Sequence, residues 1–268
     1  MLRFALAAFA LTVSTAAATA QDLGSPVFSS QSQGSALGFT LRGGVSTAPE
    51  YFGSDDQEAA PVLGGQLNYL RLGGFTFGDP DPLFQPRGLS FAGSFRYIGD
   101  RDDDDSPELA GLEDVDASLE LGGGLRYATE NFSAFGDIRY GVIGHEAFVA
   151  EAGADVILRP TDRFSLRAGP RVLFGDSDYA STYFGVTAAE AATSGVAGTG
   201  FSEFDASGGL LSAGVEFGAA YRINDTWGID ATINFDKLQN DAADSPITRD
   251  DEQISASIGI TRRFTLGF

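Results

Sequence analysis

The sequence predicts an all-β fold, an antiparallel transmembrane β-barrel, from three observations. Apolar and polar residues alternate with a period of two along many segments, and these segments are longer than the roughly 5–6 residues typical of soluble strands. Their polar face carries charges of both signs in mid-strand. The connections between them alternate between short and long. Closing such a sheet would turn the charged face to a wet lumen and the apolar face to lipid.

The N-terminus has the features of an export signal. Arg3 forms a short positive region, Phe4–Val13 is apolar, and Ala18–Ala20 has the small-x-small pattern of a cleavage site. A buried N-terminal helix is the alternative, but the polar Gln21 that follows the Ala-rich run favours a signal peptide. The expected division is a signal peptide, an N-terminal periplasmic segment and an outer-membrane barrel, in residues 1–20, 21–37 and 38–268.

The composition argues against several classes of protein. The net charge is -20 and the pI is about 4.2, so nucleic-acid binding, which needs a basic surface, is disfavoured. With Cys 0, the chain has neither disulfides nor thiolate metal sites. No later segment is apolar over the roughly 18 residues of a transmembrane helix. Gly at 35 and Phe at 22, with few helix formers, favour β structure.

Ten segments show the alternation clearly. Their first apolar residues are Phe39, Val62, Leu89, Leu119, Phe132, Phe148, Phe164, Leu211, Trp227 and Ile254. A short hairpin between them, made of Phe75–Phe77 and Leu83–Phe84 around an Asp-Pro-rich break, would raise the number of strands to twelve. We expect twelve strands, with ten as the alternative, because both numbers keep the two termini on one side of the membrane. The last apolar face runs from Ile254 to Phe268, interrupted by Arg262.

The connections give an independent test of this architecture. Residues 129–131, 160–162 and 223–226 form short connections, whereas 100–115, 176–207 and 239–252 are long. Barrels of this type have short periplasmic turns and long outer loops, and only 143–146 departs from the pattern. The same register gathers aromatic residues at the turn-side rim, as an interfacial girdle requires. They are Tyr127, Phe132, Phe164, Tyr221, Trp227 and Phe268.

The inward face carries opposite charges that we expect to pair. They are Arg42, Arg96, Arg126, Arg139, Arg167, Arg171, Arg222, Glu120, Asp137, Glu151, Asp155, Glu216, Asp230 and Asp236. Barrels of about eight strands fill with side chains, whereas 16–18 strands leave a channel. At ten to twelve strands, we expect salt-bridge networks that narrow the lumen and leave little or no open-pore conductance.

Three loop motifs resemble those of the MipA/OmpV family of outer-membrane proteins. They are Pro49–Ser54, Tyr183–Thr187, and Leu238 followed by Asp244–Ile247. The resemblance spans about residues 38–264, and family chains usually stop at the aromatic residue that matches Phe264. It implies a non-enzymatic scaffold that links a murein lytic transglycosylase to a penicillin-binding protein, a murein synthase. Other members of the family are treated as porin-like proteins or adhesins, and a narrow channel for small solutes is our alternative.

The motif residues are candidate partner contacts, although turn chemistry alone explains Gly, Asp, Ser and Pro at such positions. The candidates are Tyr51, Gly53, Ser54, Tyr183, Phe184, Gly185, Val186, Asp244, Ser245 and Pro246. The other expected partners are outer-membrane lipid and lipopolysaccharide. The acidic run Asp102–Asp105 would bridge weakly to lipopolysaccharide phosphates through cations, but a solvated loop is the simpler interpretation.

No residue pattern predicts an enzyme or a cofactor. His145 is the single histidine, and no serine lies beside it in the sequence, so we expect a loop or girdle histidine rather than a catalytic base. Gly122–Gly124 lies in mid-strand without a following helix, so it is no phosphate loop. We expect these glycines to make room for bulky neighbours inside a small barrel.

Overall fold

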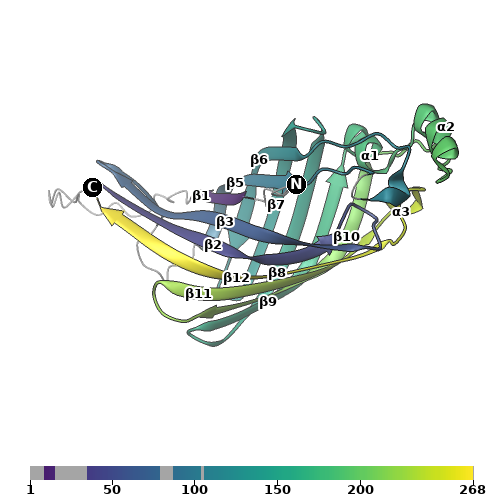
Figure 1. Cartoon of the computed structure of the whole chain (residues 1–268). Coiled ribbons are helices and arrows are strands. Elements are labelled where there is room, and N and C mark those ends of the chain that lie inside the picture. The colour runs from purple at the N-terminus through teal and green to yellow at the C-terminus, as the bar shows by residue number, and fades with distance from the viewer. Residues whose placement is uncertain (1–8, 16–34, 79–86, 104–105, 268) are drawn as a thin grey trace, which may run out of the picture.

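The computed structural model describes residues 9–15, 35–78, 87–103 and 106–267. Within these residues twelve strands form one strongly curved sheet (Figure 1). In chain order they are β1 (Phe9–Thr15), β2 (Ala36–Pro49), β3 (Gln57–Leu72), β4 (Phe75–Gly78), β5 (Gly88–Ile98), β6 (Ser118–Ala128), β7 (Phe132–Ile143), β8 (Phe148–Thr161), β9 (Phe164–Gly175), β10 (Gly209–Arg222), β11 (Trp227–Leu238) and β12 (Glu252–Gly267).

The sheet curls because a strand near the C-terminus, β12, pairs with a strand near the N-terminus, β2. Strands β5 to β12 are joined antiparallel in chain order, and β12 then pairs antiparallel with β2 from Ala256↔Thr47 to Gly267↔Ala36. Strand β3 follows β2, and β1 bridges the seam between β3 and β5. This bridge is parallel to β3 over Phe9–Val13 and touches β5 at Ser14 and Thr15. The arrangement is an antiparallel transmembrane β-barrel architecture, as the alternation predicts.

The ten clearly alternating segments all form strands, which confirms that part of the prediction. The number twelve stays a prediction, because the described strands are not the expected set. Strand β4 forms one half of the expected hairpin, whereas Leu83–Phe84 lies outside the described residues. The twelfth strand of the sheet is β1, which falls inside the expected signal peptide. The signal peptide, the segment 21–37 and the position of Phe268 also stay predictions, since most of those residues are outside the described part.

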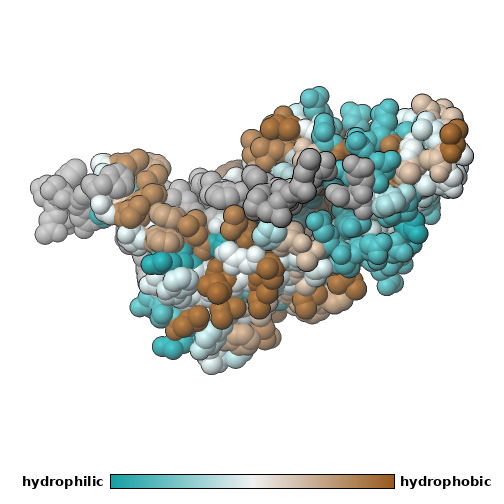
Figure 2. All heavy atoms as spheres, viewed as in Figure 1, coloured by the Kyte–Doolittle hydropathy of each residue, from teal (hydrophilic) through white to brown (hydrophobic). Residues whose placement is uncertain are grey.

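The two faces of the sheet invert the pattern of a soluble protein. In β7, Ile138 is 63% exposed on the outer face, while the next residue, Arg139, is 3% exposed. In β6, Leu121 is exposed outside and Glu120 is fully buried inside. Figure 2 shows apolar residues gathered on the convex face of the sheet, with hydrophilic residues at the end that carries the helices. Lipid is the environment that stabilises such an outer face, at about 1.5–3 kcal/mol for each large apolar side chain.

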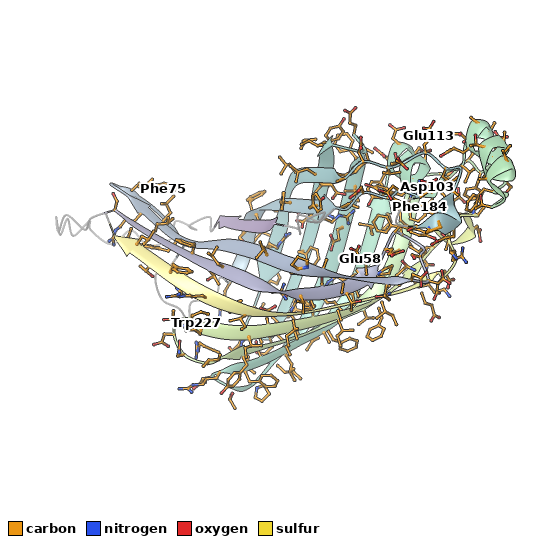
Figure 3. All side chains as sticks on the ribbon, viewed as in Figure 1. Glu58, Phe75, Asp103, Glu113, Phe184 and Trp227 are labelled. Atoms are coloured by element: carbon orange, nitrogen blue, oxygen red, sulfur yellow. The ribbon has the colours of Figure 1, made fainter. Side chains whose placement is uncertain are left out.

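Aromatic residues border the end of the barrel where the connections are short, here called the turn end. Tyr127, Phe132, Tyr221 and Trp227 are all exposed there, which agrees with the predicted girdle. Arg262 is the charged residue that interrupts the apolar face of β12. Its guanidinium carbon lies 4.9 Å from the Trp227 ring centroid, so this charge stacks on an aromatic ring. Figure 3 places Trp227 at the turn end and Asp103, Glu113 and Phe184 at the opposite end.

The opposite end, here called the loop end, contains helices that alternation does not predict. They are η1 (Pro107–Leu109), α1 (Ser177–Phe184), α2 (Ala188–Ala197) and α3 (Asp241–Asp244). Asp176 caps α1 by accepting a hydrogen bond from the Tyr179 amide, and Thr187 and Glu190 form a capping box at α2. No helix in the described ranges is long and apolar enough to cross a membrane.

We predict that Ile258→Arg destabilises the folded protein in lipid by about 2–4 kcal/mol, because Ile258 lies midway along β12 on the lipid-facing side. The control is Val196→Arg on α2, a residue that is more exposed still but lies outside the barrel wall, where the change should stay within about 0.5 kcal/mol. Urea unfolding in liposomes, followed by heat-modifiable gel migration, measures both. Equal stabilities would contradict the assignment of this face to lipid.

Candidate functional site

A lid of packed connections closes the loop end of the barrel. The lid comprises residues 50–56, 99–103, 106–117, 144–147, 176–208 and 239–251. Its apolar core is buried to the same degree as the core of a soluble domain, and Tyr179, Phe184 and Ile247 are 0–1% exposed. This core consists of two clusters, and Phe204 packs against both. Phe52 packs edge-on against Tyr183 in one of them, with ring centroids 5.1 Å apart. The long loops therefore form a compact layer with its own hydrophobic core.

The three sequence motifs meet inside this lid. The Ser245 hydroxyl donates a 2.6 Å hydrogen bond to the backbone carbonyl of Phe184, which joins the third motif to the second. Gly53 of the first motif accepts hydrogen bonds from the amides of Arg249 and Asp250, directly after the third. These bonds tie together segments that lie far apart in the chain.

Burial gives most of the motif residues a structural role. Tyr51, Gly53, Ser54, Tyr183, Phe184, Val186 and Ser245 are buried, Gly185 and Pro246 are half-buried, and Asp244 is exposed. Ser54 and Gly53 make a turn: the Ser54 amide donates to the Tyr51 carbonyl, and Gly53 has a φ of 92°. The turn chemistry considered from the sequence is therefore present, while the role of these residues as partner contacts stays a prediction.

Helix α2 is fastened to the segment before β6. The Glu190 carboxylate accepts a hydrogen bond from the amide of Glu113 at 3.0 Å while it completes the capping box with Thr187. Burial acts to raise the pKa of Glu190, but these backbone hydrogen bonds outweigh it and hold the pKa below its ordinary value. Gly111 lies directly against the backbone of Ser194, where a Cβ atom would come within 2.6 Å of an amide nitrogen.

Helix α1 extends the lid into the lumen through two tyrosines. The Tyr179 hydroxyl accepts a hydrogen bond from Arg96 of β5, and the Tyr183 hydroxyl donates to Ser118 at the start of β6. Burial raises the pKa of Tyr179 well above its ordinary value, although Arg96 opposes this in part. Tyr179 therefore stays neutral, and its hydroxyl is available as an acceptor.

Below the lid, the first ion-pair cluster runs along the inner face of the wall, over the neighbouring strands β5 to β8. It consists of Arg96, Glu120, Arg126, Asp137, Arg139 and Glu151. Glu120 is fully buried and lies 2.8 Å from Arg96 and 2.7 Å from Arg139, atom to atom. Arg139 continues to Glu151 at 2.9 Å. A fully buried carboxylate needs such partners, since removing an ion from water costs several kcal/mol.

A second ion-pair cluster lies on β8, β9 and β10. Arg171 contacts Asp155 at 2.8 Å and Glu216 at 2.9 Å, and Arg167 also pairs with Glu216. Together the two clusters contain all the predicted lumen charges from Arg96 to Glu216. Arg222 differs, because it lies at the turn end and donates to the backbone carbonyl of Asp162.

Glycines on the inner face leave space for these long side chains. Arg42 of β2 reaches across β12 to Asp230 of β11, 2.6 Å away, and passes directly over Gly259. A Cβ at Gly259 would lie 2.9 Å from Arg42 Nε. Gly124 likewise leaves room for the Asp137 carboxylate, as expected for the Gly122–Gly124 run. The glycines therefore allow charges to pair over a neighbouring strand.

His145 lies in the connection between β7 and β8, which fits the expected loop position, and it is buried where the lid meets the wall. Its ring packs against Tyr179 with centroids 4.9 Å apart, and its Nδ1 accepts a hydrogen bond from the Ala147 amide. The Ser118 hydroxyl lies nearby, but it accepts from the His145 backbone amide and from Tyr183 and donates to the Asp116 carbonyl. Because Ser118 is fully buried and does not bond the imidazole, this group connects lid and wall rather than activating a nucleophile.

Two acidic groups occur on the lid surface. Carboxylate oxygens of Glu50, Asp56 and Glu108 lie within 4.8 Å of one another and are of the type that divalent cations prefer. Burial raises the pKa of Glu50, and the charges of Glu108, Asp56 and Glu58 add to this rise against a Ser106 hydrogen bond. Of the Asp102–Asp105 run, Asp103 is exposed, and residues 104 and 105 lie outside the described part.

A cavity of about 480 Å³ separates the lid from the second ion-pair cluster. Phe52 and Leu211 form part of its apolar wall, and Arg171, Glu216 and Asp236 form part of its charged wall. A capped chamber therefore lies between the lid and the charged inner face of the wall.

An apolar outer wall, ion pairs along the inner face and a packed lid at the end of the long loops define an outer-membrane-type β-barrel. The chain belongs to the MipA family, because the model of the family described as MltA-interacting protein MipA matches residues 41–264. A comparison with curated protein sequences finds no match.

Solved structures similar to this chain include three bacterial outer-membrane proteins. An outer membrane channel from Pseudomonas putida F1 has a TM-score of 0.40 and 11% identity, covering 91% of this chain and 100% of its own. The translocator domain of the autotransporter NalP from Neisseria meningitidis has a TM-score of 0.38 and 13% identity, covering 87% and 89%. OprG from Pseudomonas aeruginosa has a TM-score of 0.24 and 12% identity, covering 87% and 98%.

We predict that Arg139→Met destabilises the protein by about 3–5 kcal/mol, because it leaves Glu120 and Glu151 without a shared cation inside the wall. Arg87→Met is the matched control, since Arg87 pairs with Glu130 on an exposed surface, where the loss should be below about 1 kcal/mol. Urea unfolding of the reconstituted protein compares the two. Similar midpoints would contradict the role given to the first ion-pair cluster.

We predict that Gly53→Ala opens the lid, because the new Cβ would lie 2.9 Å from the Thr248 Cα in addition to the strain of a positive φ. Gly198→Ala is the control that separates backbone strain from the clash of the new Cβ. Gly198 also has a positive φ, but no atom lies within 4 Å of the new Cβ. This substitution should therefore cost only about 1–2 kcal/mol of backbone strain. Limited proteolysis of the folded protein should cleave the lid faster only in Gly53→Ala. Equal cleavage rates in both variants would refute the packing argument.

Proposed function

We propose that this protein is a non-enzymatic scaffold of the Gram-negative outer membrane, exported by its signal peptide, that binds a murein lytic transglycosylase. The observation that carries the proposal is the packed lid over the loop end. Solute passage would require this lid to open, which would expose its apolar core and remove the contacts of Tyr179 with Arg96 and of Tyr183 with Ser118. A barrel covered in this way would act through its surfaces. The family is described as MltA-interacting protein MipA, so the protein that gives the family its name interacts with MltA.

The turn end is the side from which such a partner would be reached. In a barrel of this type the short turns face the periplasm, where a murein hydrolase works. Asp225 lies exposed in the turn between β10 and β11, whereas Val196 lies exposed on α2 at the opposite end. A probe placed at each of these two exposed positions would therefore report on one side of the membrane. A penicillin-binding protein, as second member of the complex, belongs to the same side.

A photo-crosslinking residue at Asp225 tests this proposal in cells. We expect it to capture a murein lytic transglycosylase, identified by mass spectrometry, while the same probe at Val196 does not capture it. Capture from Val196 alone, or from neither position while other barrel proteins are crosslinked normally, would refute the scaffold.

The alternative is a narrow channel for small solutes, which the cavity of about 480 Å³ favours. Planar-bilayer recording separates the two functions. The scaffold predicts little or no current, because the lid covers the loop end and we expect the two ion-pair clusters to narrow the lumen. A large and steady single-channel current, or solute uptake that is lost on deletion, would support the channel instead.

A further inference from the structure

The lipid-facing wall has a hollow across β8, β9, β10 and β11. It has a volume of about 360 Å³, within the range of roughly 300–1,000 Å³ typical of small-molecule sites. Its floor is formed by Ala168, Ala219 and Ala231, and Ala219 and Ala231 are direct partners in the β10–β11 ladder. The larger Leu158, Phe217 and Ile233 surround these alanines. Small residues among large ones on an otherwise convex wall leave a groove with an almost wholly apolar lining.

The charge of the turn end contrasts with that of the whole chain. Among the described residues of this end, arginines outnumber acidic residues, although the net charge of the chain is -20. The arginines are Arg71, Arg87, Arg159, Arg163, Arg222, Arg262 and Arg263, and the acidic residues are Glu130, Asp162 and Asp225. An excess of guanidinium groups at a membrane interface attracts anionic headgroups.

Two of these arginines lie between the groove and the turn end, one directly before β9 and one on β12. Arg163 lies in the turn that leads into β9, directly before Phe164, where the outward-facing column of Phe164, Leu166 and Ala168 begins. Its exposed guanidinium makes no ion pair or hydrogen bond within the described residues. On the other side, Trp227 lies on the same face of β11 as Ala231, and Arg262 stacks over it. Basic groups therefore flank the apolar groove at headgroup level.

We infer that the β8–β11 groove and the two arginines, Arg163 and Arg262, form a site for one anionic phospholipid. The alanine floor would take an acyl chain, and the guanidinium groups on either side of it at the turn end would attract the anionic headgroup. The occupant is a phospholipid rather than lipid A, because the arginines lie at the turn end, and short turns face the periplasmic leaflet. The inference rests on the barrel fold and its orientation, and it holds whether or not the scaffold proposed above is correct.

Lipid retention tests the site. The full-length protein is reconstituted in vesicles with equal amounts of phosphatidylglycerol and phosphatidylcholine and re-extracted in mild detergent, and native mass spectrometry counts the bound lipid. We expect one phosphatidylglycerol to be retained in preference to phosphatidylcholine. Ala219→Phe fills the groove and should abolish retention, whereas Ala150→Phe, on the same outer face of β8 near the loop end, should not.

The arginines provide a second measurement that does not depend on filling the groove. Arg163→Gln and Arg262→Gln should each weaken the preference for phosphatidylglycerol about fivefold, as expected for one interfacial arginine. Arg249→Gln, at the loop end where Arg249 pairs with Asp55, should leave the preference unchanged. If both lipids are retained equally and the variants do not change this, the groove makes only non-specific lipid contacts, and the inference is wrong. Lipid A retained in place of phospholipid, after extraction from native outer membranes, would also overturn it.

Discussion

The pairing of Glu120 with Arg96 and Arg139 is the interaction on which the rest of the barrel depends. A wall that faces lipid must turn every charge of its strands inward, and a narrow barrel brings those charges close together. Each buried charge then requires a partner, since an unpaired one costs several kcal/mol. The pairing also specifies register. Because the side-chain period is two, a slip of β7 by one residue would move Arg139 into lipid and Ile138 into the lumen.

The lid is an extension of the same network. Arg96 contacts Glu120 in the wall and the Tyr179 hydroxyl in α1, so one guanidinium belongs to both layers. Ser118, two residues before Glu120 in β6, receives hydrogen bonds from the His145 amide and from Tyr183. Opening the lid would therefore remove a hydrogen-bond acceptor from Arg96 and a donor from Ser118, besides exposing the aromatic core. Closure of the loop end and charge pairing in the lumen stabilise each other.

The strands and their charged face could be predicted because alternation is a local signal. Once neighbouring strands are aligned, Arg96 and Glu120 are direct cross-strand partners, so their ion pair follows from register alone. The lid could not be predicted in this way, because its contacts join segments such as Gly53 and Gln253 that have no periodicity in common. One signal was readable, the Thr-x-x-Glu capping box of Thr187 and Glu190, but it predicts where α2 begins and not where it packs. The burial of His145 could not be predicted either, because it depends on Tyr179 of α1 packing against the imidazole ring.

The lid over the loop end directs the question of function to the two ends of the barrel, and these differ in charge. Acidic residues such as Asp103, Glu113 and Asp244 lie on the lid, whereas arginines predominate at the turn end. In the proposed orientation, the basic rim faces the periplasmic leaflet and the murein. Short turns offer little area for a protein partner by themselves. A bound anionic lipid beside Trp227 and Arg262 would widen that surface, so lipid and partner would then contact adjoining parts of the same rim.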